Sequence, residues 1–196
     1  MELSGGDLIV TTIVVIFLFA ALCAALALTT VALRRPSPVL LSVAGGLVLL
    51  CFVVVAVLPY NVPLLFGAIL AILGVALAVL GGNPFARGAL AAADGGRTTE
   101  GSRGGILVEL MAEDVPPREE EILRGGTAIG YLERAAVALG VIAGFPAVIA
   151  VVVALKGIGR FTELATPAAR ERFIVGTLAS LLWACTVAGM VWLAIW

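Results

Sequence analysis

The 196-residue sequence contains no histidine, and only 13% of its residues are charged. A protein without histidine lacks the usual general base, the Ser-His and Cys-His nucleophile pairs and a common zinc or haem ligand. This disfavours histidine-dependent membrane phosphatases and rhomboid-like proteases. No P-loop or G-x-S-x-G motif appears either. We therefore expect a protein that is not an enzyme and that uses no metal and no cofactor.

Cysteine is also scarce, and the few charges nearly balance. Cys23, Cys51 and Cys185 lie singly within apolar runs, without C-x-x-C spacing, and are interpreted as small core residues. The net charge of −1 argues against nucleic acid as a partner. The N-terminal MELSGGD is acidic, whereas a secretory signal begins with basic residues, so we expect the following apolar run to be retained as a membrane span.

Hydrophobic residues, in contrast, make up 62% of the chain, well above the roughly half that is typical of globular proteins. Residues 8–33, 38–58 and 63–80 form apolar runs near the length of about 20 residues that crosses a bilayer. Arg34-Arg35-Pro36 and Gly81-Gly82-Asn83-Pro84 are expected to end the first and third runs. We predict an all-α integral membrane protein with a single membrane domain, residues 1–196.

Residues 83–125 interrupt this pattern, since they include the Gly- and Arg-rich stretch DGGRTTEGSRGG. We predict a flexible cytoplasmic loop here, between the third and fourth spans. Its second part could form one short strand or helix, followed by a short helix that begins near Pro117. The run Glu119-Glu120-Glu121 is interpreted as a solvated face rather than a metal site.

The next apolar stretch, residues 138–156, has the length of one span but contains Gly144-Phe145-Pro146 in its middle. A single crossing would place the following basic residues on the side opposite Arg34-Arg35, which the preference of Lys and Arg for the cytoplasmic side disfavours. A turn at Gly144–Pro146 keeps them on one side. We predict six transmembrane helices, including a charged helical hairpin, with the N and C termini outside. The hairpin arms are residues 126–144 and 146–165, and the last span follows Thr166-Pro167 and runs to Trp196.

The hairpin carries charges inside the membrane. Counted from the turn, Glu133 and Lys156 lie about 15–18 Å deep and should face each other. Because a charge at the bilayer centre costs about 2.5–3.5 kcal/mol, such residues usually pair or line a polar site. The cluster could bind an anion, a lipid head group or a partner's carboxylate, or it could serve only helix register, with its long side chains snorkelling. Its members are Glu133, Arg134, Lys156, Arg160 and Glu163.

Small residues recur at helical spacing in three spans and permit close contact between helices. We expect them to pack spans within one chain, with a dimer face as the alternative. Thr177 and Ser180 could hydrogen-bond across helices or to their own backbone four residues back. The small residues are Gly67, Ala71, Gly74 and Ala78 in the third span, Ala147, Ala150 and Ala154 in the fifth, and Gly176 with Ser180 in the sixth.

The stretches IGYLERAAVALGVIAGFPAVIAVVVALKGIGRF and ERFIVGTLAS resemble the C-terminal part of an uncharacterised family of bacterial multi-pass membrane proteins of unknown function. The family pattern contains I-G-x-L-E-R, a G-x-P-like turn, A-K-S-I-x-R-F and E-x-x-x-I-G-T-x-x-S, and Gly157 stands where it has serine. The resemblance covers roughly residues 127–183 and implies a bacterial cytoplasmic (inner) membrane location but no activity. The matching residues are Ile129, Gly130, Leu132, Glu133, Arg134, Lys156, Arg160, Phe161, Glu171, Gly176, Thr177 and Ser180.

Together these features favour a non-enzymatic, small transporter-like, channel-like or lipid-binding protein with an inward-facing charged site. Arg134, Lys156 and Arg160 would form its positive part, and Glu133 and Glu163 would balance it. The alternative is an accessory or scaffold subunit, in which the 83–125 loop binds a cytoplasmic partner and the charges only set helix register. Membrane lipids are the expected partners, and a second copy of the chain or another membrane protein is a further candidate.

Overall fold

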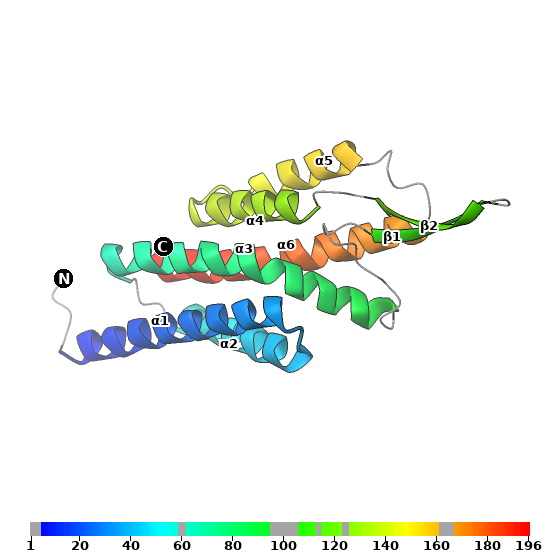
Figure 1. The fold of residues 1–196 in the computed structure, drawn as a ribbon. Coiled ribbons are helices and arrows are strands. Elements are labelled where there is room, and N and C mark those ends of the chain that lie inside the picture. The colour runs from blue at the N-terminus through cyan, green and yellow to red at the C-terminus, as the bar shows by residue number, and fades with distance from the viewer. Residues whose placement is uncertain (1–4, 59–61, 95–105, 113–114, 123–125, 161–166) are drawn as a thin grey trace.

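The computed structural model describes residues 5–58, 62–94, 106–112, 115–122, 126–160 and 167–196 (Figure 1). Within these ranges the chain forms six helices and two strands. Four of the helices, α1, α2, α3 and α6, are long and apolar enough to cross a membrane, which supports a multi-pass membrane protein. The elements are α1 (Gly5–Arg34), α2 (Pro38–Val57), α3 (Leu64–Asp94), β1 (Ile106–Ala112), β2 (Val115–Ile122), α4 (Gly126–Ile142), α5 (Val148–Arg160) and α6 (Pro167–Ile195).

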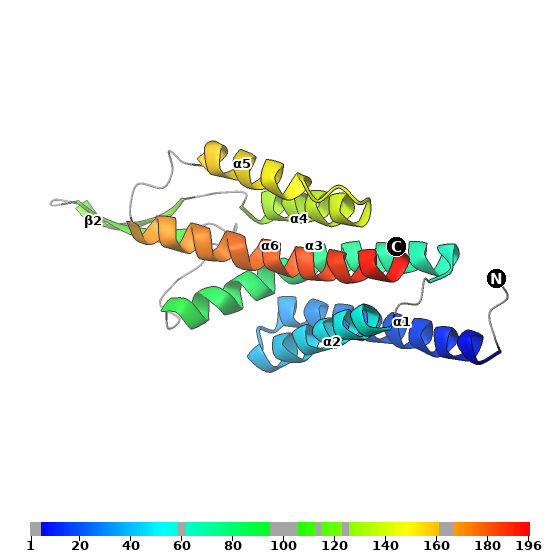
Figure 2. The same cartoon turned by 180° about the vertical axis from the view of Figure 1, so that it is seen from behind.

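Helices α3 and α6 lie side by side at the centre of the bundle (Figures 1 and 2). The α1–α2 hairpin packs on one side of this pair and α4 on the other, while α5 lies outermost and packs on α4. Valine, leucine and alanine side chains from all six helices form most of the buried core. The start of α1, the α4–α5 turn and the end of α6 lie at one end of the bundle, and the α1–α2 turn and the strands lie at the other.

Helix α3 is longer than the sequence pattern predicted. We expected it to end at Gly81–Pro84, but it continues through Pro84 to Asp94. Proline removes the backbone hydrogen bond to the fourth preceding residue and bends a helix, and Figure 1 shows α3 bent along its length. Beyond the proline, Phe85 stacks on Trp183 of α6 with ring centroids 3.9 Å apart. Packing on α6 thus holds residues 83–94 in a helix, where we had predicted the start of a loop.

The strands β1 and β2 form an antiparallel two-stranded ribbon in which Val108 is opposite Glu120. The helix predicted near Pro117 is therefore wrong, because Pro116 and Pro117 lie inside β2. Each strand of a two-stranded ribbon has an outer edge, and proline is tolerated at an edge because it lacks the N–H that a central strand needs. Residues 95–105 lie outside the described residues, so the flexible loop and its cytoplasmic partner stay predictions.

The hairpin turn lies where the sequence predicted it. Helix α4 ends in a Schellman motif: the N–H groups of Phe145 and Gly144 donate to the carbonyls of Gly140 and Val141, at 2.7 and 3.0 Å. Gly144 has φ +77°, which glycine adopts without steric cost. Residues 138–156 therefore do not form one continuous span. The arms have 17 and 13 described residues, or about 25 and 20 Å, against the roughly 30 Å of a bilayer core, so their full crossing stays a prediction.

Candidate functional site

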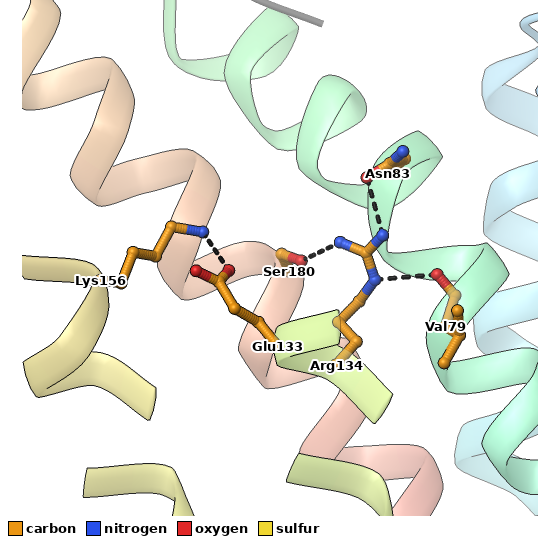
Figure 3. Close-up of polar contacts among 6 residues, drawn as sticks. All are labelled: Val79, Asn83, Glu133, Arg134, Lys156 and Ser180. Carbon is orange, nitrogen blue, oxygen red and sulfur yellow. Dashed lines mark hydrogen bonds and ion pairs between the residues drawn. The ribbon is translucent and has the colours of Figure 1, made fainter. Parts of the chain in front are cut away.

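Glu133 of α4 and Lys156 of α5 form an ion pair across the hairpin, with the Nζ and Oε2 atoms 2.5 Å apart (Figure 3). They meet because they lie at nearly equal distances from the turn between two antiparallel helices. The side chains are 12% and 15% exposed, respectively. The ammonium of Lys156 also lies 5.8 Å from the ring centroid of Phe173 on α6. The structure thus brings the two central members of the predicted cluster together, beside α6.

Arg134 points the other way. Consecutive residues of a helix are about 100° apart around its axis, and the Arg134 side chain extends towards α3 and α6 while Glu133 extends towards α5 (Figure 3). It is only 2% exposed. Its Nε donates to the Val79 carbonyl at 2.8 Å, one terminal nitrogen to Ser180 Oγ at 2.8 Å and the other to Asn83 Oδ1 at 2.9 Å. Arg134 is therefore not part of a shared positive site with Lys156, contrary to the prediction.

The Arg134 contacts join three helices, since Val79 and Asn83 belong to α3 and Ser180 to α6. No carboxylate among the described residues forms an ion pair with this guanidinium. Neutral oxygens hold the buried cation instead, and its ring contact with Tyr131, 5.2 Å from centroid to Cζ, adds cation–π attraction. We interpret this cluster as a structural brace of the bundle interior.

Glycine provides the space for this brace. A Cβ added to Gly82 would overlap the Arg134 side chain, and one added to Gly130 would lie 3.1 Å from its terminal nitrogen. Gly82, Asn83 and Phe173 were not predicted from the sequence as parts of the site. The first two were interpreted as part of a helix end, although an asparagine directly after an apolar run was a signal that a polar partner lay elsewhere in the fold.

Two predicted members of the cluster cannot be placed. Arg160 is the last residue of α5, and its side chain lies outside what the structure describes, as does all of Glu163. Of the two hydrogen-bonding modes considered for Ser180, the structure shows the one across helices, because its Oγ accepts from Arg134.

The predicted small residues behave differently in different helices. In α3, Cβ atoms added at Gly67 and Gly74 would lie 3.3 and 2.6 Å from Ile195 and Val191 of α6, so the two helices approach closely here. Ala71 also packs on the core, Ala78 is fully buried, and Gly176 of α6 lies next to Leu90 of α3. Along the second arm of the hairpin the expected packing is absent, since its small residues are exposed. These are Ala147, just before α5, and Ala150 and Ala154 within it.

A groove of about 350 Å³ lies beside the ion pair. Apart from the pair, its walls are apolar or small. Ile129 and Leu155 are exposed on the bundle surface, so the groove opens outward and not into the Arg134 cluster. Such a site suits a molecule that is charged at one end and apolar at the other. The lining residues are Ile129, Glu133, Val152, Leu155, Lys156 and Gly159.

The described fold contains four helices that are long and apolar enough to cross a membrane, which is compatible with a multi-pass membrane protein. Comparison with models of known protein families, with curated proteins and with solved structures found no match. The resemblance of residues 127–183 to an uncharacterised bacterial family therefore stays a prediction.

Proposed function

We propose that this protein is a non-enzymatic membrane protein that binds a membrane lipid in the groove between α4 and α5. One observation carries the proposal: an ion pair stands in the wall of a groove whose other walls are apolar. A transporter or channel would need a polar path through the bundle. Arg134, the buried charge of the described interior, is enclosed by α3, α4 and α6 and hydrogen-bonded to α3 and α6. The described interior therefore supports a polar path less well than the outer groove supports a lipid site.

The position of the pair suits a lipid head group. Glu133 lies seven residues after the start of α4, or about 10 Å along the helix. That end of the hairpin is also the end of the bundle at which Arg34 and Arg35 lie. A head group could contact the charges while its chains follow Val152 and Leu155 into the apolar layer. The side chains of Glu133 and Lys156 are charged and already largely shielded from water. A charged head group would therefore give them further partners without a large additional loss of hydration.

Lipid retention tests the proposal. In detergent-purified protein titrated with phospholipid and examined by native mass spectrometry, we expect Lys156→Met to weaken lipid binding about tenfold. Gly159→Phe should do the same by filling the groove, since a Cβ at Gly159 meets no atom within 4 Å. Gly157 has the same open surroundings on the same helix but does not line the groove, so Gly157→Phe is the matched control. Equal retention by both phenylalanine variants and the unchanged protein would refute the lipid site.

The proposed topology has both termini and the hairpin turn on the outer side. Its support is that the turn and the end of α6 share one end of the bundle, while Arg34 and Arg35 lie at the other. With the three native cysteines changed to serine, Phe145→Cys should react with a membrane-impermeant maleimide in intact cells. Arg35→Cys should react only after permeabilisation. Phe145 is 60% exposed, so protection at 145 together with labelling at 35 would reverse the orientation.

A further inference from the structure

We infer that the groove selects a phospholipid whose head group carries both a phosphate and a primary ammonium, with the phosphate at Lys156 and the ammonium at Glu133. This inference rests on the proposed lipid-binding function and names its ligand class. It follows from the balance of charge in the groove, from the direction of Arg134 and from the chemistry of the groove walls.

The described groove walls contain one cation and one anion, and these are paired. A purely anionic head group that bound Lys156 would draw the ammonium away from Glu133. The carboxylate, only 12% exposed, would then lose its partner in a poorly hydrated site, which is costly. A zwitterionic head group would instead offer an opposite charge to each residue. Both charges of the pair would then remain compensated when the lipid is bound.

Arg134, the residue after Glu133 in the sequence, does not change this balance. Arg134 directs its nitrogens to Val79, Asn83 and Ser180 and lies on the other side of α4. It is unavailable to a phosphate in the groove. Lys156, in contrast, also contacts the ring of Phe173. Its ammonium can therefore keep its position when the Glu133 carboxylate accepts a further hydrogen bond from a ligand.

The groove walls also distinguish a primary ammonium from a quaternary one. Proteins recognise quaternary ammonium groups with aromatic side chains, and none of the groove-lining residues is aromatic. A carboxylate such as that of Glu133 accepts hydrogen bonds, which a primary ammonium donates and a quaternary ammonium cannot. The ammonium of the ligand would reproduce the bond that Lys156 now makes to Glu133.

The experiment compares three phospholipids with identical acyl chains: phosphatidylethanolamine, phosphatidylcholine and phosphatidylglycerol. Each is titrated into the full-length, delipidated protein, and binding is read by native mass spectrometry. We expect phosphatidylethanolamine to bind at least about fivefold more tightly than the other two. Glu133→Gln should abolish its advantage over phosphatidylcholine, and Gly159→Phe should weaken the binding of all three.

The outcomes separate the inference from the proposed function. If phosphatidylglycerol or phosphatidylcholine binds as well as phosphatidylethanolamine, and Gly159→Phe still weakens binding relative to Gly157→Phe, the ligand class is wrong and the lipid site stands. An Arg160→Gln variant then shows whether that arginine supplies the charge that favours an anionic lipid. If no lipid distinguishes Gly159→Phe from Gly157→Phe, binding is non-specific and both proposals fail.

Discussion

Replacing Arg134 with lysine is expected to lower the free energy of unfolding by about 3 kcal/mol. The guanidinium of Arg134 donates to three acceptors on two helices. A lysine side chain is shorter and ends in a single ammonium nitrogen, so it cannot reach all three acceptors. Ser180, which is buried, and Asn83, which is partly buried, would then lose hydrogen bonds that they now accept from Arg134. Unfolding of the detergent-solubilised protein, followed by the fluorescence of its tryptophans, measures the effect. Arg35→Lys, at an exposed position after α1, is the control and should unfold like the unchanged protein.

A second variant tests whether the brace works through its hydrogen bonds. Arg134→Met combined with Asn83→Leu and Ser180→Ala removes the buried charge and both side-chain acceptors together. Because apolar replacement of a whole buried polar group is often tolerated, this triple variant should be more stable than Arg134→Met alone. If Arg134→Lys is as stable as the unchanged protein, or if the triple variant is the less stable of the two, the interpretation of Arg134 as a brace is wrong.

Gly82→Ala is expected to destabilise the protein by at least about 2 kcal/mol, although alanine normally favours a helix over glycine by up to about 1 kcal/mol. The added methyl group would overlap the Arg134 side chain, which is held by three hydrogen bonds and cannot move freely. The same unfolding assay applies. Gly46→Ala in α2 is the matched control, since a Cβ there meets no atom within 4 Å, and it should be neutral or slightly stabilising.

The two changes should also be coupled. Arg134→Met removes the guanidinium and its hydrogen bonds, so adding Gly82→Ala to this variant should cost less than adding it to the unchanged protein. A double-mutant cycle measures this difference. Additive effects would mean that Gly82 acts through some contact other than Arg134, and identical behaviour of Gly82→Ala and Gly46→Ala would show that the close approach is not required.

Much of the helical fold could be predicted because its causes are local. Apolar runs of about 20 residues, bounded by Arg34-Arg35-Pro36 and similar signals, indicated the helices, and α2 begins and ends within one residue of its predicted bounds. The turn at Gly144 was also predictable, because glycine and proline together end a helix. Two errors, the early end of α3 and the helix near Pro117, came from interpreting a proline as a helix boundary. Proline weakens a helix locally, but contacts elsewhere in the fold decide whether the helix continues.

For the candidate site, the sequence by itself determined that Glu133 and Lys156 meet. The turn position and the rise per residue place them opposite each other whatever the rest of the bundle does. Only the tertiary structure decided the role of Arg134. Its direction depends on where α3 and α6 pack and on the space left by Gly82, and these contacts join residues some 50 positions apart. The helical period assigns a residue to one face of its helix. The packing of neighbouring helices decides whether that face lines a groove, packs into the core or contacts lipid.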